Sequence, residues 1–241
     1  MSAAGRYVAF DIETAKVLPE SVTDLMDYRP LGIACAAAVV SGREEPVVWY
    51  GANGGEPAAQ MSRVEVRSLL GDLSAWVADG YTLLSWNGLA FDFNVLAEES
   101  GLPDVCAALA LEHVDMMFHV VCQLGYPVAL GKAAEGLGIS GKAGGLSGRD
   151  APVMWSQGRY QDVLQYNTQD ARLSLRVAQE AERRAEFVWI TRRGTKGCMP
   201  LEQGWCSVRQ AHRLPLPDTS WMSNPTTREH FTTWLPPNSL I

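Results

Sequence analysis

An acidic pair inside an apolar strand near the N-terminus is the feature that most limits how this chain can fold. Asp11 and Glu13 lie in the run Tyr-Val-Ala-Phe-Asp-Ile-Glu-Thr (7–14). Residues two apart on a strand leave the same face, so both carboxylates point one way while Phe10 and Ile12 point the other. Charged groups on a buried face cost free energy unless they are paired or bind a cation. An edge strand that faces solvent is the alternative explanation.

Two further acids follow, each about eighty residues after the last, and each closes a short polar motif. Asp92 ends Asn-Gly-Leu-Ala-Phe-Asp, which begins at Asn87, and Asp170 ends Tyr-Asn-Thr-Gln-Asp, which begins at Tyr166. Tyr166 and Asp170 are one helical turn apart, and their face continues through apolar Leu173, so Asp170 is expected to point inward. Taken alone, Asp92 is better explained as a helix N-cap and Asn87 as a turn residue.

Four carboxylates in one pocket would repel each other by roughly 4 kcal/mol per close pair at an effective dielectric constant near 20. Bound cations remove that repulsion. Acting together, the four acids therefore predict a two-metal enzyme.

The order of the remaining elements predicts an α/β fold with a mixed sheet flanked by helices. Apolar runs predict strands at 7–12, 31–40, 46–50 and 81–86, the second and third of which are joined by a hairpin-like link. Helical spacing covers 61–78, a segment from Asp92, 104–111, 115–124, 128–137 and 160–184. The stripe in 61–78 consists of Val66, Leu69, Leu70, Leu73 and Val77. Residues 136–148 form a glycine-rich loop in this interpretation.

These motifs resemble those of the tyrosine-type subgroup of the DEDD 3′→5′ exonucleases, which have a ribonuclease H-like fold and include the proofreading domains of DNA polymerases. The matching positions are Asp11, Glu13 and Thr14 in the first motif, Asn87, Phe91 and Asp92 in the second, and Tyr166 and Asp170 in the third. Gln165 stands where the histidine-type subgroup would have histidine. The resemblance covers about residues 1–185, includes no polymerase domain, and does not reach 187–241.

The resemblance implies two divalent cations, Mg²⁺ or Mn²⁺, and a role for each acid. Asp11 would bridge both ions, Glu13 and Asp170 would hold the ion that activates water, and Asp92 would hold the other. Tyr166, with a reference pKa near 10, is neutral at pH 7. We therefore expect it to orient the attacking water and not to remove its proton. Thr14, Asn87, Phe91 and Lys142 are the expected substrate-binding residues.

The expected substrate is single-stranded DNA, from which the enzyme would release nucleoside monophosphates, with RNA as the close alternative. The net charge of −7 does not exclude a polyanion, because residues 1–150 carry nine basic against nineteen acidic residues (−10) and 151–241 carry eleven against eight (+3). A non-catalytic nucleic-acid-binding module and a phosphatase with a similar acid cluster are the other classes that fit.

Several other motifs have weaker claims to a function. Gly136 to Ala143 nearly spells a phosphate-binding loop, but alanine replaces the required Ser or Thr, so nucleoside triphosphate binding is rejected. Lys142 and Arg149 are either contacts to a nucleic-acid backbone or parts of a plain linker. Asp115 is a possible fifth acid, although a helix cap is the favoured reading. The four histidines lack metal-ligand spacing.

The last segment differs from the rest of the chain. We expect a domain at 1–186 and an irregular Trp- and Pro-rich extension at 187–241 that packs on it, with one helix at 227–235 that buries Phe231 and Trp234. Base stacking by these aromatic residues and binding of a partner protein are the alternatives. The odd cysteine count, with no Cys-x-x-Cys pair, and the lack of a long apolar segment favour a cytoplasmic protein with reduced thiols and no membrane partner. The oligomeric state is left open.

Overall fold

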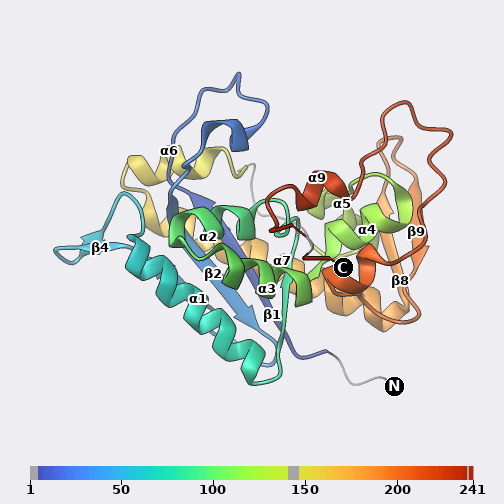
Figure 1. Ribbon diagram of the computed structural model, residues 1–241, viewed down its shortest axis with the longest axis horizontal. Coiled ribbons are helices and arrows are strands. Elements are labelled where there is room, and N and C mark those ends of the chain that lie inside the picture. The colour runs from blue at the N-terminus through green and yellow to red at the C-terminus, as the bar shows by residue number, and fades with distance from the viewer. Residues whose placement is uncertain (1–4, 141–146, 238, 241) are drawn as a thin grey trace.

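A five-stranded mixed sheet forms the centre of the computed structural model, which describes residues 5–140, 147–237 and 239–240 (Figure 1). The strands, in their order across the sheet, are β3 (Val47–Tyr50), β2 (Ile33–Val40), β1 (Tyr7–Thr14), β6 (Thr82–Ser85) and β7 (Val114–Asp115). Strand β2 is antiparallel to β1 and β3, whereas β6 is parallel to β1 and β7. The predicted α/β class is confirmed.

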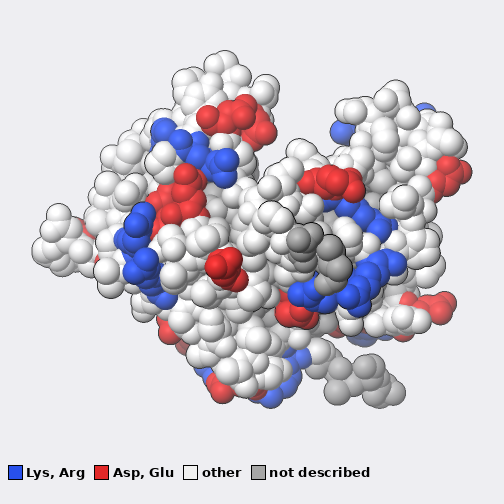
Figure 2. All heavy atoms as spheres, viewed as in Figure 1, with Lys and Arg blue, Asp and Glu red and all other residues white. Residues whose placement is uncertain are grey.

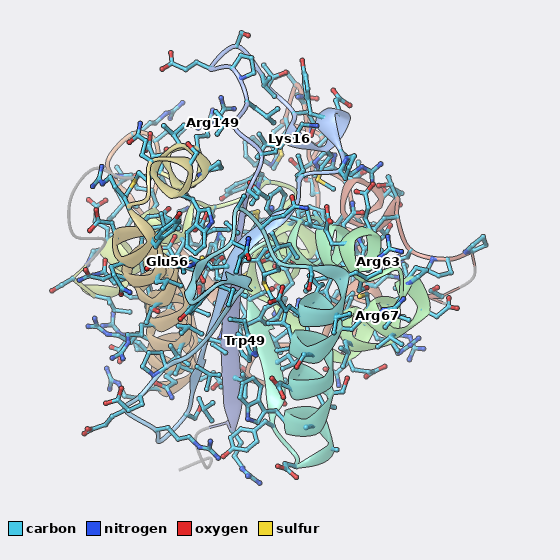
Figure 3. All side chains as sticks on the ribbon, turned by 90° about the vertical axis from the view of Figure 1, so that its left-hand side faces the viewer. Lys16, Trp49, Glu56, Arg63, Arg67 and Arg149 are labelled. Atoms are coloured by element: carbon cyan, nitrogen blue, oxygen red, sulfur yellow. The ribbon has the colours of Figure 1, made fainter. Side chains whose placement is uncertain are left out.

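Helices flank both faces of this sheet. They are α1 (Arg63–Ala78), α2 (Asp92–Ser100), α3 (Pro103–Glu112), α4 (Met116–Leu124), α5 (Leu130–Leu137), α6 (Asp150–Ser156) and α7 (Tyr160–Arg184). In Figure 1, α1, α2 and α3 lie in front of the sheet and α7 lies behind it. Figure 3 shows the sheet nearly edge-on between α1 and α7. No helix in the described ranges is long and apolar enough to cross a membrane.

The alternation of β1 divides the interior into two clusters. Val8, Phe10 and Ile12 join one buried cluster with α1 and α2, in which the Phe10 and Phe93 rings meet edge to face with centroids 5.1 Å apart. Ala9 joins the second cluster, whose largest contribution comes from α7. Since side chains alternate along a strand, Asp11 and Glu13 share the α7 face with Ala9.

Helix α1 begins at a capping box, in which Ser62 and Glu65 each accept a hydrogen bond from the other's backbone amide. Four of the five residues in its predicted apolar stripe are buried, but Val77 is 39% exposed, so that part of the prediction was wrong. Val77 lies in the last turn, one residue before the helix ends. The buried stripe ends at Leu73, which is fully buried in the core.

The start of the predicted glycine-rich loop at 136–148 is helical, and its residues 141–146 lie outside the described residues. Gly136 belongs to α5, and a Cβ atom placed there would lie 2.4 Å from the Trp189 Cα. The glycine therefore permits close packing of a helix on a strand and does not mark a turn. Helix α6, which begins at Asp150, was not predicted.

The C-terminal segment contains more regular structure than its sequence suggested. Strands β8 (Glu186–Ile190) and β9 (Lys196–Pro200) form an antiparallel pair, and α8 (Val208–His212) follows. The predicted helix at 227–235 is shorter, since α9 spans Glu229–Thr232. Short elements complete the fold: the 3₁₀ helix η1 (Leu25–Tyr28) and the strand pair β4 (Ala52–Asn53) and β5 (Glu56–Pro57).

Phe231 and Arg228 are among the residues that hold this segment in place. The Phe231 ring is 2% exposed and lies 5.4 Å from the Phe118 ring, centroid to centroid. The guanidinium group of buried Arg228 donates hydrogen bonds to the carbonyl oxygens of His212, Cys122 and Pro215 at 2.6–3.1 Å. The domain division at 186/187 stays a prediction.

Candidate active site

The C-terminal half of β1 carries the first two acids. Glu13 is 5% exposed and Asp11 is half-buried. Glu13 pairs with Cys35 on β2, and the pKa of the Cys35 thiol is raised first by burial and then by the charges of Glu13 and Asp11. The charges of both carboxylates therefore raise the pKa of the same buried thiol, as expected for side chains on one face of the strand.

Helix α7 brings Tyr166 and Asp170 to the same face. Both residues are buried. The pKa of the Tyr166 hydroxyl is raised well above its ordinary value, first by burial, then by the charges of Asp170 and Glu13, by a hydrogen bond with Asp170 and by the charge of Asp11. One hydroxyl thus lies in the field of three carboxylates from two elements that are far apart in the sequence. The structure thus brings these four residues to one face, and their catalytic and metal-binding roles stay predictions.

Asn167 is a member of this group that the sequence analysis missed. Its side-chain Nδ2 donates a 2.6 Å hydrogen bond to Asp11 Oδ2, and the residue is fully buried. Within the described residues, its Oδ1 is buried and has no hydrogen-bond partner. A helical pattern could have suggested it, because Asn167 lies three residues before Asp170 on an inward-facing stripe.

Asp92 lies at the edge of β1, where its carboxylate contacts the strand backbone. It is the first residue of α2, whose N-cap is Phe91, so the N-cap interpretation of Asp92 was wrong. Its Oδ1 instead accepts a 3.1 Å hydrogen bond from the backbone amide of Ile12, beyond the point where β6 stops pairing with β1. Burial and the nearby charge of Asp115 raise the pKa of Asp92.

Asp115 has the structural role that was favoured for it. It caps α4 by accepting a hydrogen bond from the Phe118 amide, and it also accepts from the amides of Asn87 and Leu89 at 2.9 Å. Asn87 adopts a left-handed backbone conformation with φ of 72°, which fits its interpretation as a turn residue. The turn that precedes α2 is therefore fixed by a buried carboxylate.

The remaining predicted substrate residues are placed as follows. Thr14 is buried at the end of β1, and Phe91 is half-buried directly before Asp92. Lys142 lies outside the described residues. Arg149 donates hydrogen bonds to the carbonyl oxygens of Glu20 and Val22, so it holds the loop after β1. Figure 3 shows Arg149 and Lys16 beyond the upper end of the sheet.

The residues present fit a hard divalent cation in their chemistry. Asp11, Glu13, Asp92 and Asp170 all offer carboxylate oxygens, which Mg²⁺ and similar ions prefer. Across the ranges that the structure describes, however, no three His, Cys, Asp or Glu side chains stand close enough together to hold an ion. The argument for a bound cation therefore rests on the chemical type of the four side chains and on the three carboxylates whose charges raise the pKa of Tyr166.

The chain matches a protein-family model. The model of the RNase H superfamily matches residues 36–181, which is more than half of the chain. The matched range includes Asp92, Tyr166 and Asp170 but begins after Asp11 and Glu13. A search of curated proteins found no match.

Proposed function

The chain belongs to the RNase H superfamily, and on this premise we propose that it is a metal-dependent 3′→5′ exonuclease of the tyrosine type. Membership of the superfamily indicates nuclease chemistry. The proposal adds that the enzyme hydrolyses phosphodiester bonds from the 3′ end of single-stranded DNA and releases nucleoside monophosphates. The observation that carries it is that α7 meets the acidic end of β1: Asn167 of α7 donates a hydrogen bond to Asp11, and Tyr166 and Asp170 are buried on the same helix.

We propose Asp11, Glu13, Asp92 and Asp170 as the ligands of two divalent ions. When bound, such ions would activate water on one side of the phosphodiester and stabilise the leaving oxygen on the other. The chain's own contribution is orientation. Asn167 fixes one oxygen of Asp11, and the Ile12 amide fixes one oxygen of Asp92. A neutral hydrogen-bond donor fixes the orientation of a carboxylate but leaves its negative charge available to a metal ion.

Tyr166 would position the attacking water. Its raised pKa keeps the hydroxyl protonated at neutral pH, so it can donate or accept a hydrogen bond but cannot serve as a general base. The sequence analysis likewise expected a neutral hydroxyl that orients water. Burial among negative charges is the physical reason why the pKa of Tyr166 is raised.

The test is incubation of the full-length protein with 5′-labelled single-stranded DNA and RNA oligomers of the same sequence, with Mg²⁺, Mn²⁺ or EDTA. A ladder that shortens from the 3′ end, requires the metal and is faster on DNA supports the proposal. Asp11→Asn should abolish cleavage, whereas Asp162→Asn, an exposed change on α7, should not.

Three outcomes would contradict the proposal. Faster cleavage of RNA would make the enzyme an exoribonuclease. Binding without cleavage would favour the non-catalytic module. Residual activity above about one percent in Asp11→Asn would exclude Asp11 as an essential ligand, since loss of a shared ligand should remove far more rate than that.

A further inference from the structure

A groove of about 740 Å³ lies outside the carboxylate group and has no role in the chemistry described above. It is lined by residues from three separate parts of the chain: Met26, Asp27 and Arg29, then Asn94, Ala97, Glu98, Gly101 and Pro103, and finally Trp234. Figure 1 shows the loop after β1 above α2, the two elements that supply most of these residues, and Figure 2 shows both acidic and basic side chains on this part of the surface.

The groove lies close to the proposed site. Asn94, which lines it, is two residues after Asp92 on α2. In a helix this spacing puts the two Cα atoms about 5–6 Å apart. Their side chains leave α2 on different faces, so a strand whose 3′ end reaches the carboxylates would pass around the first turn of α2 to bring its next nucleotides to the groove.

One wall of the groove offers a fixed aromatic surface. The Trp234 indole donates a 2.6 Å hydrogen bond to the Leu89 carbonyl oxygen, so the ring is held in place before any ligand binds. Arg29 is held as well, through hydrogen bonds to Asn94 Oδ1 and to the Met26 carbonyl oxygen. Indole and guanidinium planes both stack on nucleobases.

The charges of the groove favour a base over a phosphate. Asp27 and Glu98 are exposed in its lining and would repel a phosphate, but a carboxylate can accept a hydrogen bond from the amino group of cytosine. The cations stand at the far end: Arg63 and Arg67 of α1 each lie 3.7 Å from the position that a Cβ on Gly101 would take. Figure 3 shows both arginines on α1.

We propose that this groove binds an unpaired base of the substrate strand, prefers bases that carry an exocyclic amino group, and passes the following phosphates to Arg63 and Arg67. The proposal rests on the proposed nuclease function and deepens it. It gives the C-terminal segment, through Trp234, a part in choosing the substrate.

The experiment measures binding in the Asp11→Asn background, so that the strand is not cleaved. Fluorescence anisotropy at pH 7.5 gives the Kd for labelled oligo-dC and oligo-dU, two pyrimidine strands that differ only in the 4-amino or 4-oxo group and the adjacent ring nitrogen. The parent protein should bind oligo-dC about 2- to 10-fold more tightly, the range for one net hydrogen bond. Adding Asp27→Asn and Glu98→Gln should remove this preference, while Glu202→Gln, another exposed acid, should not.

Two further variants separate stacking from charge. Trp234→Leu should weaken binding of both strands about fivefold or more, and Trp221→Leu, at a tryptophan that is 70% exposed, should leave it unchanged. Arg63→Gln should weaken both strands equally and lower the slope of log Kd against log salt by about one. Equal binding by the parent and by the Asp27/Glu98 and Trp234 variants would overturn the proposal.

Failure of the proposal can be told apart from failure of the proposed function. If the wild-type protein cleaves single strands while the groove variants bind like their parent, only the groove assignment is wrong. If the wild-type protein neither cleaves nor binds a single strand, the nuclease function itself is wrong, and the groove assignment falls with it.

Discussion

Tyr166 allows the sharpest test at the scale of single residues, because its proposed role of orienting the attacking water depends on one oxygen atom. Tyr166→Phe removes only the hydroxyl and should lower kcat about 10²–10³-fold, the range for one well-placed polar group. The Mg²⁺ concentration for half-maximal rate should stay the same. Tyr160→Phe, on the same helix beside Trp155, is the matched control and should keep full activity. Wild-type turnover in Tyr166→Phe would remove this residue from the mechanism.

Asn167 is expected to act through Asp11 and not on the substrate. Asn167→Leu keeps the branching and the number of side-chain heavy atoms but removes the 2.6 Å hydrogen bond to Asp11 Oδ2. Because a partner that orients a metal ligand is typically worth 10- to 100-fold, the Mg²⁺ concentration for half-maximal rate should rise by about that factor. A Mg²⁺ titration of the exonuclease rate measures it, with the exposed Gln165→Leu as control. A purely structural role would lower the melting temperature and leave the Mg²⁺ titration unshifted.

At the scale of elements, Gly136 explains how α5 and β8 pack, and α5 provides its own control. Gly136→Ala puts a Cβ 2.4 Å from the Trp189 Cα, in backbone that cannot move aside, and should cost about 1–3 kcal/mol of unfolding free energy. Gly131→Ala, on the same helix, meets nothing within 4 Å and should stabilise by about 0.5–1 kcal/mol. Urea unfolding of both variants measures the difference. If both variants changed the unfolding free energy equally, the close approach of α5 to β8 at Gly136 would not be needed for stability.

The same glycine illustrates what the sequence could predict about the elements. Long periodic segments were predictable: the helix expected at 160–184 spans those residues, and the strand at 31–40 is β2 within two residues. Gly136 was assigned both to the predicted helix at 128–137 and to the predicted loop at 136–148, because a glycine that permits close packing has the same local signal as one that forms a loop. The β8–β9 pair was missed because the pairing of Phe187 with Met199 depends on contacts that no local pattern reveals.

The candidate site was predictable to a similar extent. The direction of a side chain follows from the period of its strand or helix. Asp11 and Glu13 could therefore be placed on one face of a strand, and Asp170 on the inward face of a helix. The hydrogen bond from the Ile12 amide to Asp92 could not be foreseen, because it depends on where β6 ends relative to β1. The groove joins Met26, Asn94 and Trp234, residues that only the tertiary fold brings together.

At the scale of the whole molecule, the C-terminal segment should stabilise the fold as well as line the groove. Deleting 224–241 removes the Phe231 ring from Phe118 and the Arg228 hydrogen bonds to the Cys122 and Pro215 carbonyl oxygens. Truncating a buried phenylalanine to alanine costs about 3–5 kcal/mol. In a chain of this size each kcal/mol lowers Tm by about 2–4 °C. The deletion should therefore lower Tm by at least about 6 °C, which differential scanning fluorimetry can measure.

Two point variants divide that loss between its causes. Phe231→Ala should reproduce most of the fall in Tm yet keep the affinity for single strands, because Phe231 does not line the groove. Trp234→Leu should weaken strand binding with a smaller fall in Tm, since its indole is only partly buried. If the deletion kept full stability and lost only strand affinity, the segment would be a substrate platform alone. Unchanged stability and affinity after the deletion would leave partner binding as the remaining explanation for this aromatic segment.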